Sequence, residues 1–189
     1  MPSLRAVSRI AGAAALVSWP FCVWLALTHP EWRALMLALA LLFALRLAVM
    51  PAGALRLPGI ILLLAGALLA LAGYWLPQAR LMLWYPVLVN LVMLLLFGGS
   101  LFAGPPLVER IARWQEGGEL PLAARRYTRK VTRVWSLFFL FNGALALATV
   151  LSGSLRAWTL WNGVLSYLAM GTLFAVEWCV RQRVKRHAR

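Results

Sequence analysis

Residues 81–103 read LMLWYPVLVNLVMLLLFGGSLFA, and this stretch contains no charged side chain. An α-helix rises about 1.5 Å per residue, so a stretch of this length can cross the roughly 30 Å hydrocarbon core of a bilayer. Inside that core each backbone amide needs a partner within the chain, which favours a helix. The stretch therefore predicts a membrane-spanning helix.

Five further apolar stretches flank this one. Each has about the length that a spanning helix needs, and prolines, glycines and charged residues separate them. The predicted spans are residues 10–28, 32–50, 58–76, 81–103, 134–152 and 158–179. We expect an all-α fold: one integral membrane domain over residues 1–189, a polytopic helix bundle with about six transmembrane helices in three hairpins.

The composition agrees with a bilayer environment. The chain is 63% hydrophobic and 13% charged, whereas soluble domains are about 45–50% apolar and about 25% charged. A formal net charge of +14 would point to nucleic acid in a soluble protein. Here the charges alternate with predicted spans, so the sequence favours anionic lipid as the partner and no nucleic acid.

The basic residues also predict the orientation. Sixteen of the 19 Lys and Arg residues lie at the two termini, near the turn after the second span, or between the fourth and fifth spans. Only Arg33, Arg80 and Arg156 fall on the other side. Because cytoplasmic loops carry most Lys and Arg, both termini are predicted to be cytoplasmic. Aromatic residues near the predicted outer ends form an expected interfacial belt: Trp24, Trp32, Tyr74, Trp75, Trp84, Tyr85, Trp158 and Trp161.

Residues 104–133 form the one sizeable polar segment, predicted to be cytoplasmic. Leu107, Ile111 and Trp114 recur at helical spacing, which predicts a short amphipathic helix at the membrane interface. Gly117-Gly118 ends it. The basic residues that follow, together with two in the tail, are candidate contacts for anionic phospholipid or for an acidic partner protein, and the sequence leaves both open: Arg125, Arg126, Arg129, Lys130, Arg133, Arg181 and Arg183.

Side chains for most hydrolytic and metal-dependent chemistry are missing. The sequence has no aspartate, two histidines and two cysteines in separate apolar segments. Clustered carboxylates for Mg²⁺, histidine pairs for a metal and a Ser-His dyad are therefore not predicted. No catalytic residue, metal site or cofactor is expected.

Three polar residues within the predicted spans are candidates for an intramembrane site: Asn90, Asn142 and Glu177. Polar groups inside a membrane are costly and are functional candidates by default. Asparagines also join membrane helices to one another, and Glu177 precedes Arg181 by four residues, the spacing of an ion pair within one helix. Both a functional and a packing role stay open.

A longer pattern runs Arg125-Arg126-Tyr127-Thr128-x-x-Val131-Thr132-x-x-Trp135-x-x-Phe138-Phe139-x-x-Asn142, followed by Trp161-Asn162-Gly163, Ser166-Tyr167 and Glu177-x-x-x-Arg181. Over residues 104–185 it resembles a family of small uncharacterised bacterial inner-membrane proteins associated with aryl-polyene (xanthomonadin-type) pigment clusters. Some members carry the name of a ketosynthase or of a DNA gyrase, but the residues of neither activity are present. The Trp-x-x-Phe-Phe spacing is distantly similar to the intracellular septation protein family.

The resemblance implies a bacterial inner-membrane location and a role in the cell envelope, and it assigns no catalytic residue. The leading functional hypothesis is a non-enzymatic accessory protein that supports aryl-polyene lipid or envelope biogenesis by binding lipid or biosynthetic partner proteins. The alternatives are a small lipid transporter or flippase, and a membrane enzyme component that acts with a partner.

Overall fold

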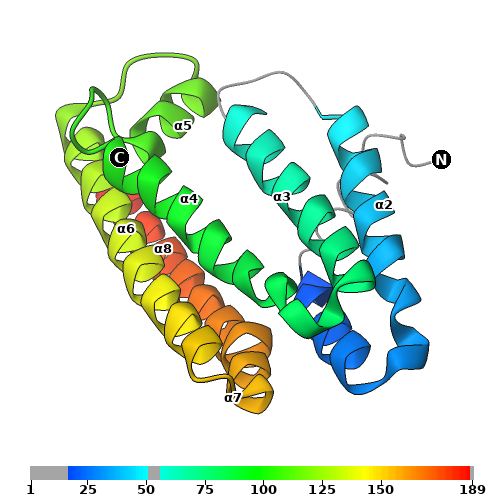
Figure 1. Cartoon of the computed structure of the whole chain (residues 1–189). Helices are drawn as coiled ribbons and strands as arrows, with labels where there is room; N and C mark the ends of the chain where they lie inside the picture. The colour runs from blue at the N-terminus through cyan, green and yellow to red at the C-terminus, as the bar shows by residue number, and fades with distance from the viewer. Residues whose placement is uncertain (1–16, 51–55, 188–189) are drawn as a thin grey trace. The chain divides into compact units, whose positions relative to one another are not determined.

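The structure, a computed structural model, describes residues 17–50 and 56–187, with side chains up to residue 183. It is 87% helical, and no strand occurs within these ranges. Four helices in this part of the chain are long and apolar enough to cross a membrane (Figure 1): Arg56–Trp75, Leu81–Gly99, Leu122–Leu151 and Leu155–Arg183. The predicted all-α class and membrane character are confirmed.

The first two predicted spans differ from the other four. Residues 10–16 of the predicted first span lie outside the described residues, and its described part is the apolar helix Val17–Thr28. Helix α2, Ala34–Ala48, has 15 residues, which corresponds to about 22 Å and is short of the roughly 30 Å core. A single residue, Arg33, separates it from the preceding 3₁₀ turn, Pro30–Trp32. The predicted count of six spans is therefore not confirmed, because apolar composition does not show where a helix ends.

The chain divides into two compact units. Unit 1 consists of Met1–Val89 and Ala146–Gly163, and unit 2 consists of Asn90–Leu145 and Val164–Arg189. Each unit has its own buried cluster of hydrophobic side chains.

Unit 1 is built on α2 and α3, which lie side by side in Figure 1. Helix α3 runs over Arg56–Trp75. The unit also contains the helix Val17–Thr28, the short helix α7 (Leu155–Leu160) and three 3₁₀ turns, Pro30–Trp32, Pro77–Ala79 and Leu81–Trp84. The rings of Trp19, Phe43 and Tyr85 meet in the core, with centroids 4.5–5.7 Å apart. Gly66 allows α3 to approach Phe43, since an added Cβ would lie 2.6 Å from the ring.

Two buried indoles attach this core to the turn Leu81–Trp84. Trp19 Nε1 donates to the carbonyl of Met82 at 3.3 Å, and Trp158 Nε1 donates to that of Leu83 at 3.0 Å. Trp158 and Tyr85 are thus core residues, which differs from their predicted place in the interfacial belt. Four other members of that belt are exposed, as a lipid-facing position requires: Trp24, Trp32, Trp75 and Trp84.

Unit 2 contains parts of α4 and α6 together with α5 and α8. The bounds are Tyr85–Gly99 (α4), Leu107–Glu116 (α5), Leu122–Leu151 (α6) and Ser166–His187 (α8), with a π-helical turn, Trp161–Leu165, before α8. α6 and α8 lie side by side (Figure 1), and the rings of Trp135 and Phe174 pack between them with 4.5 Å between centroids. Phe139 packs on Phe97 of α4 at 5.3 Å.

The predicted amphipathic helix corresponds to α5. It ends at Gly117, whose positive φ of 71° suits glycine and whose N–H donates to the carbonyl of Arg113. Leu107 is buried in unit 2, while Trp114, predicted on the same face, is 84% exposed. The first turn of α5 therefore packs against protein, and its last turn presents an aromatic side chain outward.

Candidate functional site

The two intramembrane asparagines contact each other. Asn142 Nδ2 on α6 donates to Asn90 Oδ1 on α4 at 2.9 Å, and both side chains are buried. Gly143 keeps the helices close, because a Cβ added there would lie 3.0 Å from the Cβ of Asn90. A small residue beside an amide hydrogen bond is a common way for membrane helices to associate. The pair joins α4 to α6 within unit 2.

Glu177 belongs to a second polar cluster, which joins α6 to α8. Its Oε1 accepts from Arg181 Nε at 2.9 Å and from the hydroxyl of Tyr127 at 3.0 Å. The ion pair with Arg181 follows from the spacing of four residues. The contact with Tyr127 was not predicted, since no local pattern relates residues 50 positions apart. Glu177 thus contacts Tyr127 and Arg181, while Asn90 and Asn142 contact each other.

Arg125 is bound within the chain. It donates through Nη2 to Glu119 Oε2 and through Nε to the carbonyl of Leu120, both at 3.0 Å. Its Nε also lies 4.0 Å from Oε1 of Glu109. Glu109 is buried and accepts two hydrogen bonds from Arg113. Arg125 thus holds the connection between α5 and α6, a role the sequence did not indicate.

Four other bases form an exposed row on α6, which we call the cationic stripe. Its members follow the i, i+3, i+4, i+7 spacing of one helix face, and all are exposed: Arg126, Arg129, Lys130 and Arg133. No ion pair involves any of them in the described part of the chain. Continuing in the same direction, the exposed residues are apolar: Leu137, Leu140 and Phe141.

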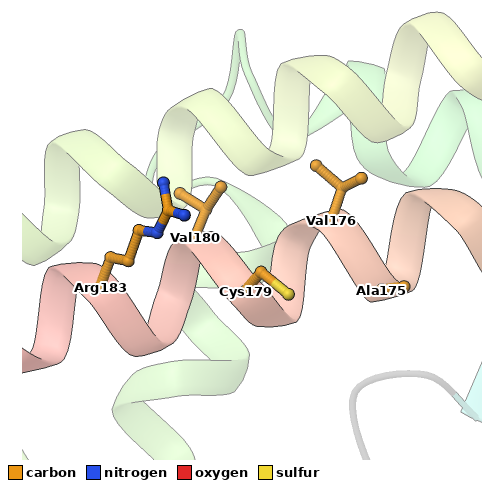
Figure 2. A pocket seen from close by; sticks show the side chains of 5 residues that line it. All are labelled: Ala175, Val176, Cys179, Val180 and Arg183. Atoms are coloured by element: carbon orange, nitrogen blue, oxygen red, sulfur yellow. The ribbon is translucent and has the colours of Figure 1, made fainter.

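Two hollows in the described part of unit 2 are lined in part by predicted contact residues, Arg181 and Arg183. One, of about 160 Å³, lies between α5, α6 and α8, and its wall includes Ile111, Tyr127 and Arg181. The other, of about 330 Å³, lies along α8 (Figure 2). Its lining comes from that helix alone and includes Arg183 and the free thiol of Cys179, with apolar neighbours.

In the described residues, no three His, Cys, Asp or Glu side chains come together as a metal site would require. The features above define the chain as a helical protein with four helices able to cross a membrane. Comparisons with protein-family models, with curated proteins and with solved structures found no match.

Proposed function

We propose that this chain is a multi-pass protein of the bacterial inner membrane that binds anionic phospholipid through its cationic stripe. It acts without catalysing a reaction, as an accessory to aryl-polyene lipid or envelope biogenesis. In this proposal the membrane is crossed by about six helices, with both termini in the cytoplasm. The observation that carries it is the change from cationic to apolar side chains along one exposed face of α6.

This change has a direct physical meaning. Arg133 is the last base of the stripe, and Leu137, one helical turn further, is 65% exposed. An exposed apolar face favours lipid tails, and uncompensated cations favour the headgroups of an anionic leaflet. The boundary between tails and headgroups then falls between these two residues.

An exposed aromatic side chain supports the same boundary. Arg129 Nη2 donates to the carbonyl of Leu101 at 3.2 Å, which brings the α4–α5 connection to the stripe. The next residue, Phe102, is 92% exposed. Aromatic rings are enriched at the headgroup level, so Phe102 and the stripe are suited to the same depth.

Six of the seven predicted contact residues divide into those that form an ion pair with a glutamate and those that do not. Arg125 and Arg181 are neutralised by Glu119 and Glu177, so they contribute little to a surface field. Each base of the stripe contributes about 1 kcal/mol of attraction near an anionic surface. Lipid is therefore favoured over an acidic protein partner, because the stripe continues into a lipid-facing surface.

The test compares two double variants of the full chain in nanodiscs that contain phosphatidylglycerol. Replacing Arg126 and Lys130 with Gln should lower the number of phosphatidylglycerol molecules retained in native mass spectrometry. Replacing Arg46 and Arg56, two bases outside unit 2, with Gln removes the same charge. This control variant should retain as many phosphatidylglycerol molecules as the wild type. Equal losses in both variants would contradict a specific role of the stripe.

A lipid transporter is the second candidate, and one observation favours it. Asn142 Oδ1 is buried and has no hydrogen-bond partner within the described residues, so it is available to a polar ligand. The other polar groups are engaged: Asn90 with Asn142, and Glu177 with Arg181. Transport of a fluorescent lipid that is abolished by Asn142→Leu at normal protein level would favour this function.

A further inference from the structure

A pocket of about 230 Å³ lies in unit 1, where the end of the helix Val17–Thr28 meets the turn Pro77–Ala79. Arg33, Gln78 and Arg80 line it, and its apolar wall comes from Ala26, Leu27 and two prolines. Arginine does not lose its proton in proteins. The pocket is therefore positive at every physiological pH.

Among the described residues, no acid neutralises these two arginines. All five acids of the chain are glutamates, and Glu31 alone belongs to unit 1. Glu31 contacts His29 Nδ1 at 3.2 Å, and no ion pair links it to Arg33 or Arg80 in the ranges that the structure describes. The pocket thus carries two formal charges that the protein leaves uncompensated.

Arg33 presents a donor without an acceptor. Its Nε is buried and has no hydrogen-bond partner within the described residues. Buried donors are nearly always paired, because an unpaired one loses its hydration without compensation. A ligand oxygen in the pocket would satisfy this group.

Arg80 is held in an uncommon backbone conformation. Its φ of 50° is the one positive φ at a non-glycine position in the described chain. Its Nη1 donates to the carbonyl of Gly153 at 3.2 Å, which anchors one edge of the guanidinium and leaves the other donors available. Such backbone outliers persist where the surroundings hold them, and they cluster at binding sites.

The predicted topology makes this pair unusual. Arg33, Arg80 and Arg156 are the three bases that the charge distribution places on the outer side, where cations are scarce. Two of the three line the same pocket. The predicted topology does not explain why two of these three bases share one pocket, whereas binding of an anion would.

We propose that this pocket binds a phosphate group, with Arg33, Arg80 and Gln78 as its donors. The planar forks of two guanidinium groups match the oxygens of a phosphate. A volume of about 230 Å³ exceeds the roughly 30 Å³ of one water, so the pocket has room for a phosphate and part of its ester. Free phosphate and a phospholipid headgroup share this chemistry. The pocket is built from residues of unit 1, whereas the cationic stripe belongs to unit 2.

The experiment uses the full chain in a maltoside detergent, which carries no phosphate. In one arm, inorganic phosphate is titrated and the unfolding temperature is followed. In the other arm, phosphatidylglycerol with a photoreactive headgroup is crosslinked and the modified peptides are mapped. We expect saturable stabilisation in the first arm, or adducts in residues 26–33 or 77–80 in the second. The first result identifies free phosphate, and adducts without phosphate stabilisation identify a lipid headgroup.

Matched variants decide whether the pocket is responsible. Arg33→Gln and Arg80→Gln should each weaken the response about tenfold or more, since each removes charge-assisted hydrogen bonds. Arg156→Gln removes the same charge outside the pocket lining and should leave the response unchanged. If Arg80→Gln fails to fold, Arg80→Gly takes its place, because glycine accepts the positive φ.

Three results overturn the proposal. The first is the absence of saturation and of adducts at these segments in both arms. The second is an unchanged response in folded variants at positions 33 and 80. The third is an equal loss in Arg156→Gln, which would show that general charge and not the pocket attracts the anion.

Discussion

The hydroxyl of Tyr127 donates a hydrogen bond of 3.0 Å to Glu177 Oε1 and so joins α6 to α8 across 50 positions of sequence. The same oxygen accepts from Arg181 at 2.9 Å. Glu177 on α8 therefore forms an ion pair with Arg181 and a hydrogen bond with Tyr127. This arrangement favours a structural role for Glu177, because its charge is already satisfied within unit 2.

Removing the Tyr127 hydroxyl should destabilise the protein. We expect Tyr127→Phe to lower the free energy of unfolding by about 1 kcal/mol, the usual net value of such a hydrogen bond, measured by denaturation in mixed micelles. Tyr74→Phe is the control, since the Tyr74 ring packs edge-on against Trp75 and keeps this contact without its hydroxyl. Together with Glu177→Gln, Tyr127→Phe should show coupling in a double-mutant cycle; additive effects would mean that the two groups do not interact.

The amide pair of Asn90 and Asn142 should also be coupled. Replacing either with Leu removes one hydrogen bond between α4 and α6, and we expect a loss of roughly 0.6 kcal/mol and at most about 1.7 kcal/mol. Replacing both should cost less than the sum of the single losses, because the hydrogen bond that the two amides share can be lost only once. If the loss of stability in the double variant equals the sum of the two single losses, the two amides do not interact.

Close packing at Gly66 predicts a steric effect. In Gly66→Ala the new methyl would lie 2.6 Å from a ring carbon of the fully buried Phe43, and overpacking of this kind costs about 1–3 kcal/mol. Gly171→Ala is the matched control on α8, because apart from the adjacent backbone of its own helix nothing described lies within 4 Å of its added Cβ. The control should be neutral or slightly stabilising in the same unfolding measurement. Equal behaviour of the two variants would contradict the contact between α2 and α3.

Glu109 and Glu116 lie on the same short helix and should respond differently to loss of charge. Glu109 is buried and accepts from Arg113, so Glu109→Gln should cost about 1–3 kcal/mol. Glu116 is exposed, and Glu116→Gln should change stability by less than about 0.5 kcal/mol. Limited proteolysis between α5 and α6 provides a second readout: faster cleavage is expected for Glu109→Gln alone.

Local features of the structure were predictable where the chemistry depends on spacing along one helix. The ion pair of Glu177 with Arg181 and the stop of α5 at Gly117 are of this kind. The length of α2 was not predictable in the same way. Residues 32–50 are apolar throughout most of their length, yet the turn at Pro30–Trp32 and the end at Ala48 leave only a short helix.

The sequence by itself determined the class of this protein, because apolar length and charge distribution are properties of the chain read in one dimension. Long uncharged stretches select a helical membrane fold whatever their neighbours are. The tertiary structure decided which polar groups meet. Asn142 is hydrogen-bonded to Asn90, Tyr127 is hydrogen-bonded to Glu177, and Arg33 shares a pocket with Arg80. These contacts depend on how helices far apart in sequence pack and rotate against each other, which hydropathy and spacing do not encode.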